Sequence, residues 1–264
     1  TEERPESFKG PFLKEEIKLI NTISEQIGAY LFFKQLKSVF EYKNKQKLLV
    51  AVDCIIFGFD SEQIKLLLFK RKVEPYSGNW SLVGAFINEN LSLNEAAQEI
   101  LFEYTGLKDI YLEELQTYSK VDRDPGERVI SVAFFSLMRI NEIVEESVEK
   151  FDAHWFNLDE IPELILDHRE MVDNAITKLR QKARYQPIGF ELLPTKFTIP
   201  QLQLLYECIY NKKIDDRNFR KKIFSYDILT KTNLKDKSTS KKGAFLYKFN
   251  KKKFNSFIAK GYNF

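Results

Sequence analysis

Residues 80–107 read WSLVGAFINENLSLNEAAQEILFEYTGL. The first part, through residue 87, is a short apolar segment typical of a strand, and the polar residues 88–90 indicate a turn. Residues 93–107 carry apolar side chains at helical spacing and end on Thr105-Gly106-Leu107. The stretch therefore predicts a strand, a turn and a helix in this order.

Strand-like segments surround this unit. Residues 48–59 (LLVAVDCIIFGF) and 64–72 (IKLLLFKRK) are apolar, β-branched runs with a polar turn between them. Further strand-like segments lie around 110–120, 129–140 and 153–158, and a second helical pattern covers 170–184. Strands mixed with helices predict an α+β domain of about 135 residues. Pro187, Gly189 and Pro194 then mark a boundary.

The segment at 80–107 resembles a Nudix box with its leading strand and turn. That pattern is a glycine, five residues, a glutamate, seven residues, and then Arg-Glu-apolar-x-Glu-Glu-x-Gly-apolar. Aligned on Thr105-Gly106-Leu107, the opening glycine falls on Ala85, the loop glutamate on Leu91, the arginine on Glu99, the next glutamate on Ile100 and the final pair on Glu103 and Tyr104. The stretches VDRDPGERVISVAFF and HWFNLDEIPELILDHREMVDNAI match later segments of the family, so the resemblance covers residues 48–184.

The resemblance implies a Nudix-like α/β/α sandwich with a mixed sheet, but not the family's catalysis. Nudix hydrolases hold Mg²⁺ or Mn²⁺ with helix carboxylates, and the metal polarises a diphosphate and activates water. Two of these carboxylates stand four residues apart on one face, and their positions are Ile100 and Tyr104 here. Glu99 and Glu103 lie about 100° around the helix from that face. We therefore expect no metal, no cofactor and no catalytic residue, with Glu103 as a surface group.

The C-terminal part of the chain is strongly basic. Residues 187–264 contain 17 Lys and Arg against 6 Asp and Glu, whereas the whole chain has a net charge of only +3. This asymmetry favours a polyanionic partner, although a solvated lysine-rich face would give the same composition. The strings LLPTKFTIPQLQLLYE and DDRNFRKKI resemble the winged helix-turn-helix of Nudix-related transcriptional regulators (NrtR-type).

The string DDRNFRKKI predicts a DNA-binding helix. Phe219 and Ile223 fall four residues apart and would anchor it to its domain, while Asp215 and Asp216 suit its N-terminus. Arg and Asn near the start of such a helix pair with guanine and adenine in the major groove, and a wing contacts phosphates. The predicted DNA-binding residues are Arg217, Asn218, Arg220, Lys221, Lys241, Lys242 and Gly243. We interpret Lys251 to Lys253 as surface charges.

A Nudix-like domain without its metal ligands, joined to a DNA-binding module, predicts a sensor. In the resembled family, ligand binding changes operator affinity; some members respond to ADP-ribose-type nucleotides, and others govern sugar utilisation and respond to arabinose. The missing metal ligands favour a sugar here. We expect a cytoplasmic homodimeric repressor that binds double-stranded operator DNA and a small-molecule effector. The alternatives are a regulator sensing ADP-ribose, an active hydrolase of ADP-ribose-like nucleoside diphosphates with a basic nucleic-acid-binding arm, and a scaffold that binds nucleic acid through charge alone.

The predicted effector-binding residues flank the box on both sides. They are Arg71, Trp80, Asp122, Arg123, Asp124, Glu127 and Arg128, with Tyr104 and His168 as further candidates. Each has an alternative interpretation. Asp-Pro-Gly is ordinary turn chemistry, Trp80 also suits a core position, and His168 also suits a hydrogen-bonded structural residue.

The rest of the composition restricts the class of protein. The 264 residues are 44% hydrophobic and 30% charged, which is typical of a globular chain, and no stretch is long and apolar enough to span a membrane. Two cysteines exclude a disulfide scaffold. Residues 13–42 carry Ile17, Ile20, Ile27 and Leu31 at helical spacing, so this helix would pack on its own chain or on a second subunit. We expect an N-terminal helical extension (1–47), an effector domain (48–186) and a DNA-binding domain (187–264).

Overall fold

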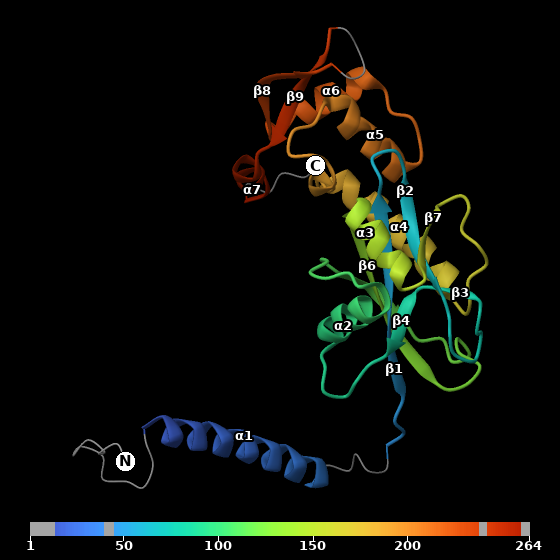
Figure 1. Cartoon of the computed structure of the whole chain (residues 1–264), viewed down its shortest axis with the longest axis vertical. Helices are drawn as coiled ribbons and strands as arrows, with labels where there is room; N and C mark the ends of the chain where they lie inside the picture. Colours follow the sequence, from blue (N-terminus) through green and yellow to red (C-terminus); the bar gives the residue numbers. More distant parts are fainter. Residues whose placement is uncertain (1–13, 40–44, 238–241, 260–264) are drawn as a thin grey trace. The chain divides into compact units, whose positions relative to one another are not determined.

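The computed structural model describes residues 14–39, 45–237 and 242–259 (Figure 1). The chain divides into two units, residues 1–47 and Leu48–Phe264. The first unit contains helix α1 (Lys14–Val39), as the sequence predicts. Its side chains Ile17, Ile20, Ile27 and Leu31 are exposed. A role for α1 in dimerisation stays a prediction.

The second unit is built on a mixed seven-stranded sheet. Strands β1 (Leu49–Phe59) and β6 (Val129–Arg139) form its parallel centre, with Leu49 opposite Val129 and Phe59 opposite Arg139. The other strands pair antiparallel: β2 (Ile64–Lys70) and β4 (Val83–Phe86) with β1, β3 (Trp80–Ser81) and β7 (Ala153–Asn157) with β2, and β5 (Glu113–Tyr118) with β6.

Helices cover both faces of this sheet. Alternate side chains of a strand point to opposite faces, so β1 supplies two cores. On one face Val52 and Cys54 belong to a cluster with α2 (Leu93–Thr105) and α3 (Glu142–Lys150), and on the other Ile55 and Phe57 pack with α4 (His168–Tyr185). A capping box begins α2, and Gly106, with φ of 71°, ends it.

The C-terminal part forms a winged helix. Its elements are η2 (Phe190–Leu192), α5 (Ile199–Tyr210), α6 (Asp216–Ser225), β8 (Leu229–Asp236), β9 (Ala244–Phe249) and α7 (Lys251–Ala259). Strands β8 and β9 pair antiparallel, and Phe197 bridges to Tyr247 at the edge of this hairpin. The apolar core under α4 continues without interruption into α5 and α6.

These elements confirm the predicted fold class, an α/β/α Nudix-like sandwich with a winged helix after it and a helix before it. Because the core runs on into the winged helix, residues 48–264 form one compact unit. The boundary at residue 187 stays a prediction based on proline and glycine positions. In the parts of the chain that the structure describes, no helix is long and apolar enough to cross a membrane.

Candidate functional site

A cavity of about 280 Å³ lies where β1 and β4 meet the β2–β3 loop and the start of α4. Its volume is near the lower end of the range for small-molecule sites, about 300 Å³. Its walls combine apolar side chains with polar ones from distant parts of the sequence. The polar lining side chains are Asp53, Arg71, Glu74, Tyr76, Ser81, Tyr104, Arg123, Asp124 and His168.

Asp53 is a buried carboxylate in the middle of the apolar strand β1, with 5% of its surface exposed. The Ser131 hydroxyl, on the neighbouring strand β6, donates a hydrogen bond to its Oδ2 at 2.5 Å. Gly84 is its pairing partner on β4, and a Cβ at Gly84 would lie 2.1 Å from Asp53 Oδ1. The glycine therefore leaves the space that the carboxylate occupies.

Arg123 lies between two carboxylates. Its Nε and Nη2 donate hydrogen bonds to the two oxygens of Asp167 at 2.9 and 2.7 Å, and Nη2 lies 3.8 Å from Asp53 Oδ2. Burial opposes the charge of the guanidinium, but Asp167 and Asp53 more than offset this effect and raise the pKa of Arg123. Arg123 is therefore a fixed, charged part of the cavity wall.

His168 is the first residue of α4 and is 4% exposed. The backbone N–H of Leu82 donates to its Nδ1 at 3.2 Å, so Nδ1 carries no proton. The neutral ring then has its proton on Nε2, which lies 3.5 Å from Asp53 Oδ1. Burial lowers the pKa of His168, and this agrees with a neutral ring.

The cavity brings together part of the predicted effector set. Arg71, Arg123 and Asp124 line it, together with the further candidates Tyr104 and His168. Arg71 Nε donates to the carbonyl of Val73 at 3.1 Å, and no carboxylate among the described residues forms an ion pair with Arg71. The outer edge of its guanidinium is therefore free to meet an anion.

The remaining predicted effector residues lie outside this cavity. The ring of Trp80 packs edge-on against Phe156 with 4.7 Å between centroids, as a core residue would. Arg128 donates to the carbonyl of Lys120 at 2.9 Å and closes its own turn. Asp122 and Glu127 are exposed in the same loop. A role for these four in ligand binding stays a prediction.

The Nudix-box helix α2 does not present the donors that a divalent metal requires. Ile100 is buried in the apolar cluster, and Tyr104 faces the cavity with its ring 5.3 Å from that of Phe69. Glu99 and Glu103 are exposed and do not line the cavity. Among the described residues, no group of three or more His, Cys, Asp or Glu side chains is placed to hold a metal ion. The residues present do not fit the family's metal site.

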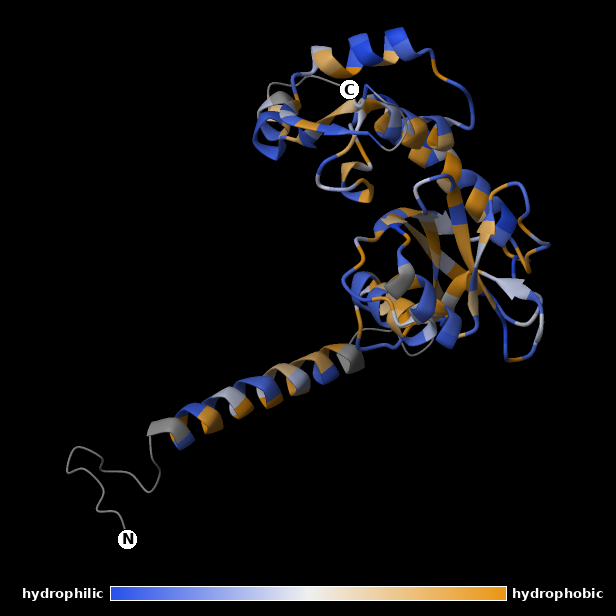
Figure 2. Cartoon of the chain, turned by 45° about the horizontal axis from the view of Figure 1, so that its top comes forward, coloured by the Kyte–Doolittle hydropathy of each residue, from blue (hydrophilic) through white to orange (hydrophobic). Residues whose placement is uncertain are grey.

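Helix α6 has the two faces that its sequence predicts. Phe219 and Ile223 are buried at 8% and 1%, and Asp215 caps the helix by accepting from the backbone N–H of Asn218 at 2.8 Å. The rest of the helix is hydrophilic along most of its length (Figure 2). Its exposed side chains include Arg217, Asn218 and Lys221, while Arg220 is half-buried and pairs with Asp216 at 2.9 Å.

The turn before α6 is fixed by residues of α5. Glu207 accepts hydrogen bonds from the backbone N–H of Ile214 at 3.0 Å and from Lys213 at 2.8 Å, and these bonds lower its pKa to about 2. Gln203 donates to the carbonyl of Ile214 at 3.0 Å. The turn between α5 and α6 is thus held by hydrogen bonds to the backbone N–H and the carbonyl of Ile214.

The wing is the β8–β9 hairpin. Lys242 is exposed at its tip, and Gly243 has φ of 68°, where a Cβ would lie 2.9 Å from the carbonyl oxygen of Asp236. Lys241, which is also predicted to contact DNA, lies outside the described residues.

Two family descriptions match this chain, one for the sheet domain and one for the winged helix. Residues 47–175 match the NUDIX domain, and residues 189–249 match the NrtR DNA-binding winged helix domain. The chain therefore belongs to the proteins that combine a NUDIX domain with an NrtR-type winged helix domain.

Individual relatives agree with this membership. An ADPR-responsive transcriptional repressor of Acinetobacter baylyi is 29% identical over 205 residues, which cover 76% of this chain and 82% of that protein. The crystal structure of Shewanella oneidensis NrtR with a 27mer DNA has a TM-score of 0.67 at 28% identity, over 81% of this chain and 97% of that one. An ADP-ribose pyrophosphatase of Methanocaldococcus jannaschii is 35% identical over 123 residues, 47% of this chain and 70% of that protein.

Three polar residues in or directly behind this cavity form its buried charge network and were not among the sequence predictions. They are Asp53, which lines the cavity, and the residues that hold the cavity wall from behind: Ser131 donates to Asp53, and Asp167 accepts from Arg123. The lining side chains Glu74, Tyr76 and Ser81 were not predicted either. A single carboxylate inside the apolar run 48–59 is the feature that would have indicated Asp53. Its partners lie 78 and 70 residues away along the chain, so only the parallel pairing of β1 with β6 and the loop after β5 bring them together.

Proposed function

We propose that this protein is a transcriptional repressor whose Nudix-like domain binds ADP-ribose or a similar nucleoside diphosphate, and whose winged helix binds operator DNA as a homodimer. The effector lies in the 280 Å³ cavity beside Arg71, Arg123 and Tyr104. Residues 48–186 sense the effector and residues 187–264 bind DNA. The domain neither needs nor holds a divalent metal.

The observation that carries this proposal is the position of Arg71 at the cavity without a carboxylate partner among the described residues. The other cavity arginine, Arg123, is already neutralised by Asp167 and Asp53. Arginine pairs bidentately with phosphate oxygens, whereas a neutral sugar offers no charge for it. An anionic effector therefore suits the cavity better than a pentose.

The expected preference for a sugar rested on the absence of metal ligands. Arg71 supplies positive charge at the cavity, so the presence of Ile100 and Tyr104 in place of metal-binding carboxylates does not argue against a diphosphate. The relative from Acinetobacter baylyi is ADPR-responsive, and none of the relatives described above is named for a sugar. Both points favour ADP-ribose over arabinose.

The alternative, an active hydrolase, would need carboxylate ligands for a divalent metal on helix α2. The relative from Methanocaldococcus jannaschii is a pyrophosphatase, yet Ile100 and Tyr104 stand at the carboxylate positions of this chain and Glu99 and Glu103 point to solvent. Among the residues that the structure describes, no carboxylate set is placed to position a metal and activate water for a diphosphate bound here. We propose that binding, rather than cleavage, is the function of the domain.

On the DNA side, α6 supplies the base-reading surface. Arg217, Asn218 and Lys221 are exposed on α6, and Arg220 becomes available to DNA when it exchanges Asp216 for a phosphate or base. Lys242 and Gly243 of the wing, and Lys241 before them in the sequence, are the residues that we expect to contact the phosphate backbone. Asp122, Glu127, Arg128 and Trp80 do not line the cavity, and their contact with an effector stays a prediction.

Calorimetric titration of the full chain tests the effector. ADP-ribose should bind without divalent metal, L-arabinose should give no heat, and Arg71→Met should weaken ADP-ribose binding by about 10-fold or more because one charge-assisted interaction is lost. Lys72→Met is the matched control, since Lys72 is exposed and does not line the cavity. Binding of arabinose alone, or Mg²⁺-dependent cleavage of ADP-ribose, would contradict the proposal.

A further inference from the structure

Helix α4 joins the ligand cavity to the winged helix as one continuous element. Its first residue, His168, lines the cavity, and the residue before it, Asp167, holds Arg123. Its second half carries Leu179 and Ala183, which belong to the same apolar cluster as Leu202 and Leu205 of α5. A shift at the cavity end of α4 therefore reaches α5 through a single helix (Figure 1).

Apolar packing between α4 and α5 does not by itself set their relative rotation. The hydrophobic effect is non-directional, and ridge-into-groove packing leaves a spread of about ±15–20° in helix orientation, whereas a hydrogen bond to one carbonyl has a fixed direction. Arg180 makes such a bond: its Nε donates to the carbonyl of Ile209 at 3.0 Å. Ile209 lies in the last turn of α5, where carbonyls lack partners within the helix and a cation is favoured.

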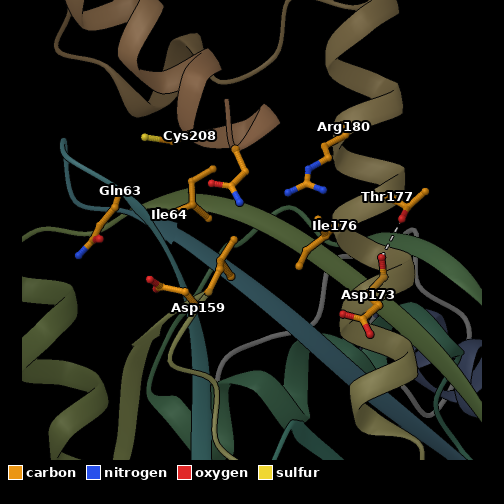
Figure 3. Close-up of a pocket in the computed structure, with 10 residues that line it drawn as sticks. Gln63, Ile64, Asp159, Asp173, Ile176, Thr177, Arg180 and Cys208 are labelled. Atoms are coloured by element: carbon orange, nitrogen blue, oxygen red, sulfur yellow. Dashed lines mark hydrogen bonds between the residues drawn. The ribbon is translucent and has the colours of Figure 1, made fainter. Parts of the chain in front are cut away.

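The surroundings of this bond leave it free to change. Arg180 borders a polar cavity of about 550 Å³ that lies between the sheet domain and the end of α5 (Figure 3). Cys208 lines the same cavity and makes the second polar contact of this turn, with its Sγ 3.1 Å from the carbonyl oxygen of Glu62. At this end of α5 the apolar core is therefore bordered by a cavity, and the hydrogen bonds of Arg180 and Cys208 lie beside it.

The end of α5 in turn positions the DNA-binding helix. Glu207 and Gln203 hold both backbone atoms of Ile214, the residue that precedes the capped start of α6. A rotation of the last turn of α5 therefore moves the turn at 211–215 and α6 with it. These contacts connect the effector cavity with the DNA-binding surface step by step.

We infer that Arg180 is the positioning residue that couples effector binding to operator affinity in this protein, an inference that rests on the proposed function. It touches neither the effector cavity nor the exposed face of α6. Its role is to make the orientation of α5, and hence of α6, change when α4 moves. Coupling of this kind is a free energy shared between two sites, so its loss changes the response without changing either site.

The test measures operator affinity with and without saturating ADP-ribose for the wild type and three variants of the full chain. The operator is a duplex that the wild type selects from a random library. Arg180→Met removes the hydrogen-bond donor and keeps an unbranched side chain out to the position of Nε, and Arg180→Lys keeps a donor that reaches the same carbonyl. Lys178→Met removes one positive charge from the same helix at an exposed position, which matches the electrostatic effect on DNA.

Arg180→Met should lower the ADP-ribose-dependent fold-change in operator affinity by about fivefold or more, with ADP-ribose affinity of the free protein and operator affinity without effector both within about twofold of wild type. Arg180→Lys should restore most of the response, and Lys178→Met should keep all of it. A wild-type response in Arg180→Met would overturn the inference, as would a loss that Lys178→Met shares. If Arg180→Met does not fold, Arg180→Lys decides, because a lost response in this folded, donor-retaining variant would contradict the role of the hydrogen bond. A wild type that binds its operator and ignores ADP-ribose would refute the proposed effector, and the inference with it.

Discussion

Replacing Asp167 with alanine tests the buried charge network that shapes the cavity. The Arg123 side chain is 2% exposed, and it would lose two hydrogen bonds of 2.9 and 2.7 Å while remaining charged. Removing one partner of a buried ion pair costs about 3–5 kcal/mol of unfolding free energy. Asp53 stays 3.8 Å from the guanidinium and offsets part of the loss, so we expect the lower end of this range, about 3 kcal/mol.

This estimate of the lost unfolding free energy includes no contribution from a helix cap. Asp167 is the N-cap residue of α4, but its side chain makes no capping hydrogen bond. For a unit of this size, a loss of about 3 kcal/mol lowers the Tm by about 6–12 °C.

The matched control is Asp173→Ala on the same helix. Asp173 also pairs with an arginine, Arg169 at 3.2 Å, but both side chains are more than half exposed. Exposed pairs of this kind contribute between about 0 and 1 kcal/mol, so the Tm should change by at most about 4 °C. Thermal and urea unfolding of the two variants compare the pairs directly. If Asp167→Ala costs no more than Asp173→Ala, the description of Arg123 as a fixed, buried charge is wrong.

Three further predictions concern single features. Burial lowers the pKa of His168, so below about pH 6.5 the unfolded chain binds a proton that the native state does not. The unfolding free energy should therefore fall as the pH decreases through this value. In urea titrations, His168→Gln should remove up to about 1.4 kcal/mol per pH unit from this pH dependence. Arg217→Ala combined with Arg220→Ala should weaken specific operator binding by about 100-fold in gel shifts while the Tm stays near that of wild type, and retained affinity would exclude α6 as the reading helix. Glu103→Gln should leave operator affinity and the effector response unchanged, because Glu103 is exposed and lies outside the cavity; loss of a measurable hydrolase activity in this variant would contradict the inactive box.

Features that depend on neighbouring residues could be predicted from the sequence. The spacing of Phe219 and Ile223 and the acidic start at Asp215 are local, so the buried face and the cap of α6 follow from helical geometry alone. The one-residue displacement of Glu99 and Glu103 within the box is equally local, and both side chains do point away from the cavity. Helical rotation of about 100° per residue is sufficient for both predictions.

Features that depend on strand pairing could not be predicted in this way. Whether Trp80 faces a ligand or the core depends on its pairing with Lys70 on β2, which places the ring beside Phe156 of β7. Asp53 meets Ser131 only because β1 and β6 run parallel in one register. The sequence names these residues but not their partners, because a shift of one residue in any strand would turn each side chain to the other face.

The binding of the full chain to its operator, measured by fluorescence anisotropy across a range of ADP-ribose concentrations without divalent metal, tests the proposed sensor most directly. We predict specific binding whose Kd changes by about fivefold or more at saturating ADP-ribose, with no change on addition of L-arabinose. An operator affinity that ADP-ribose leaves unaltered would contradict the proposal, and so would a response that appears only when Mg²⁺ permits cleavage of the nucleotide.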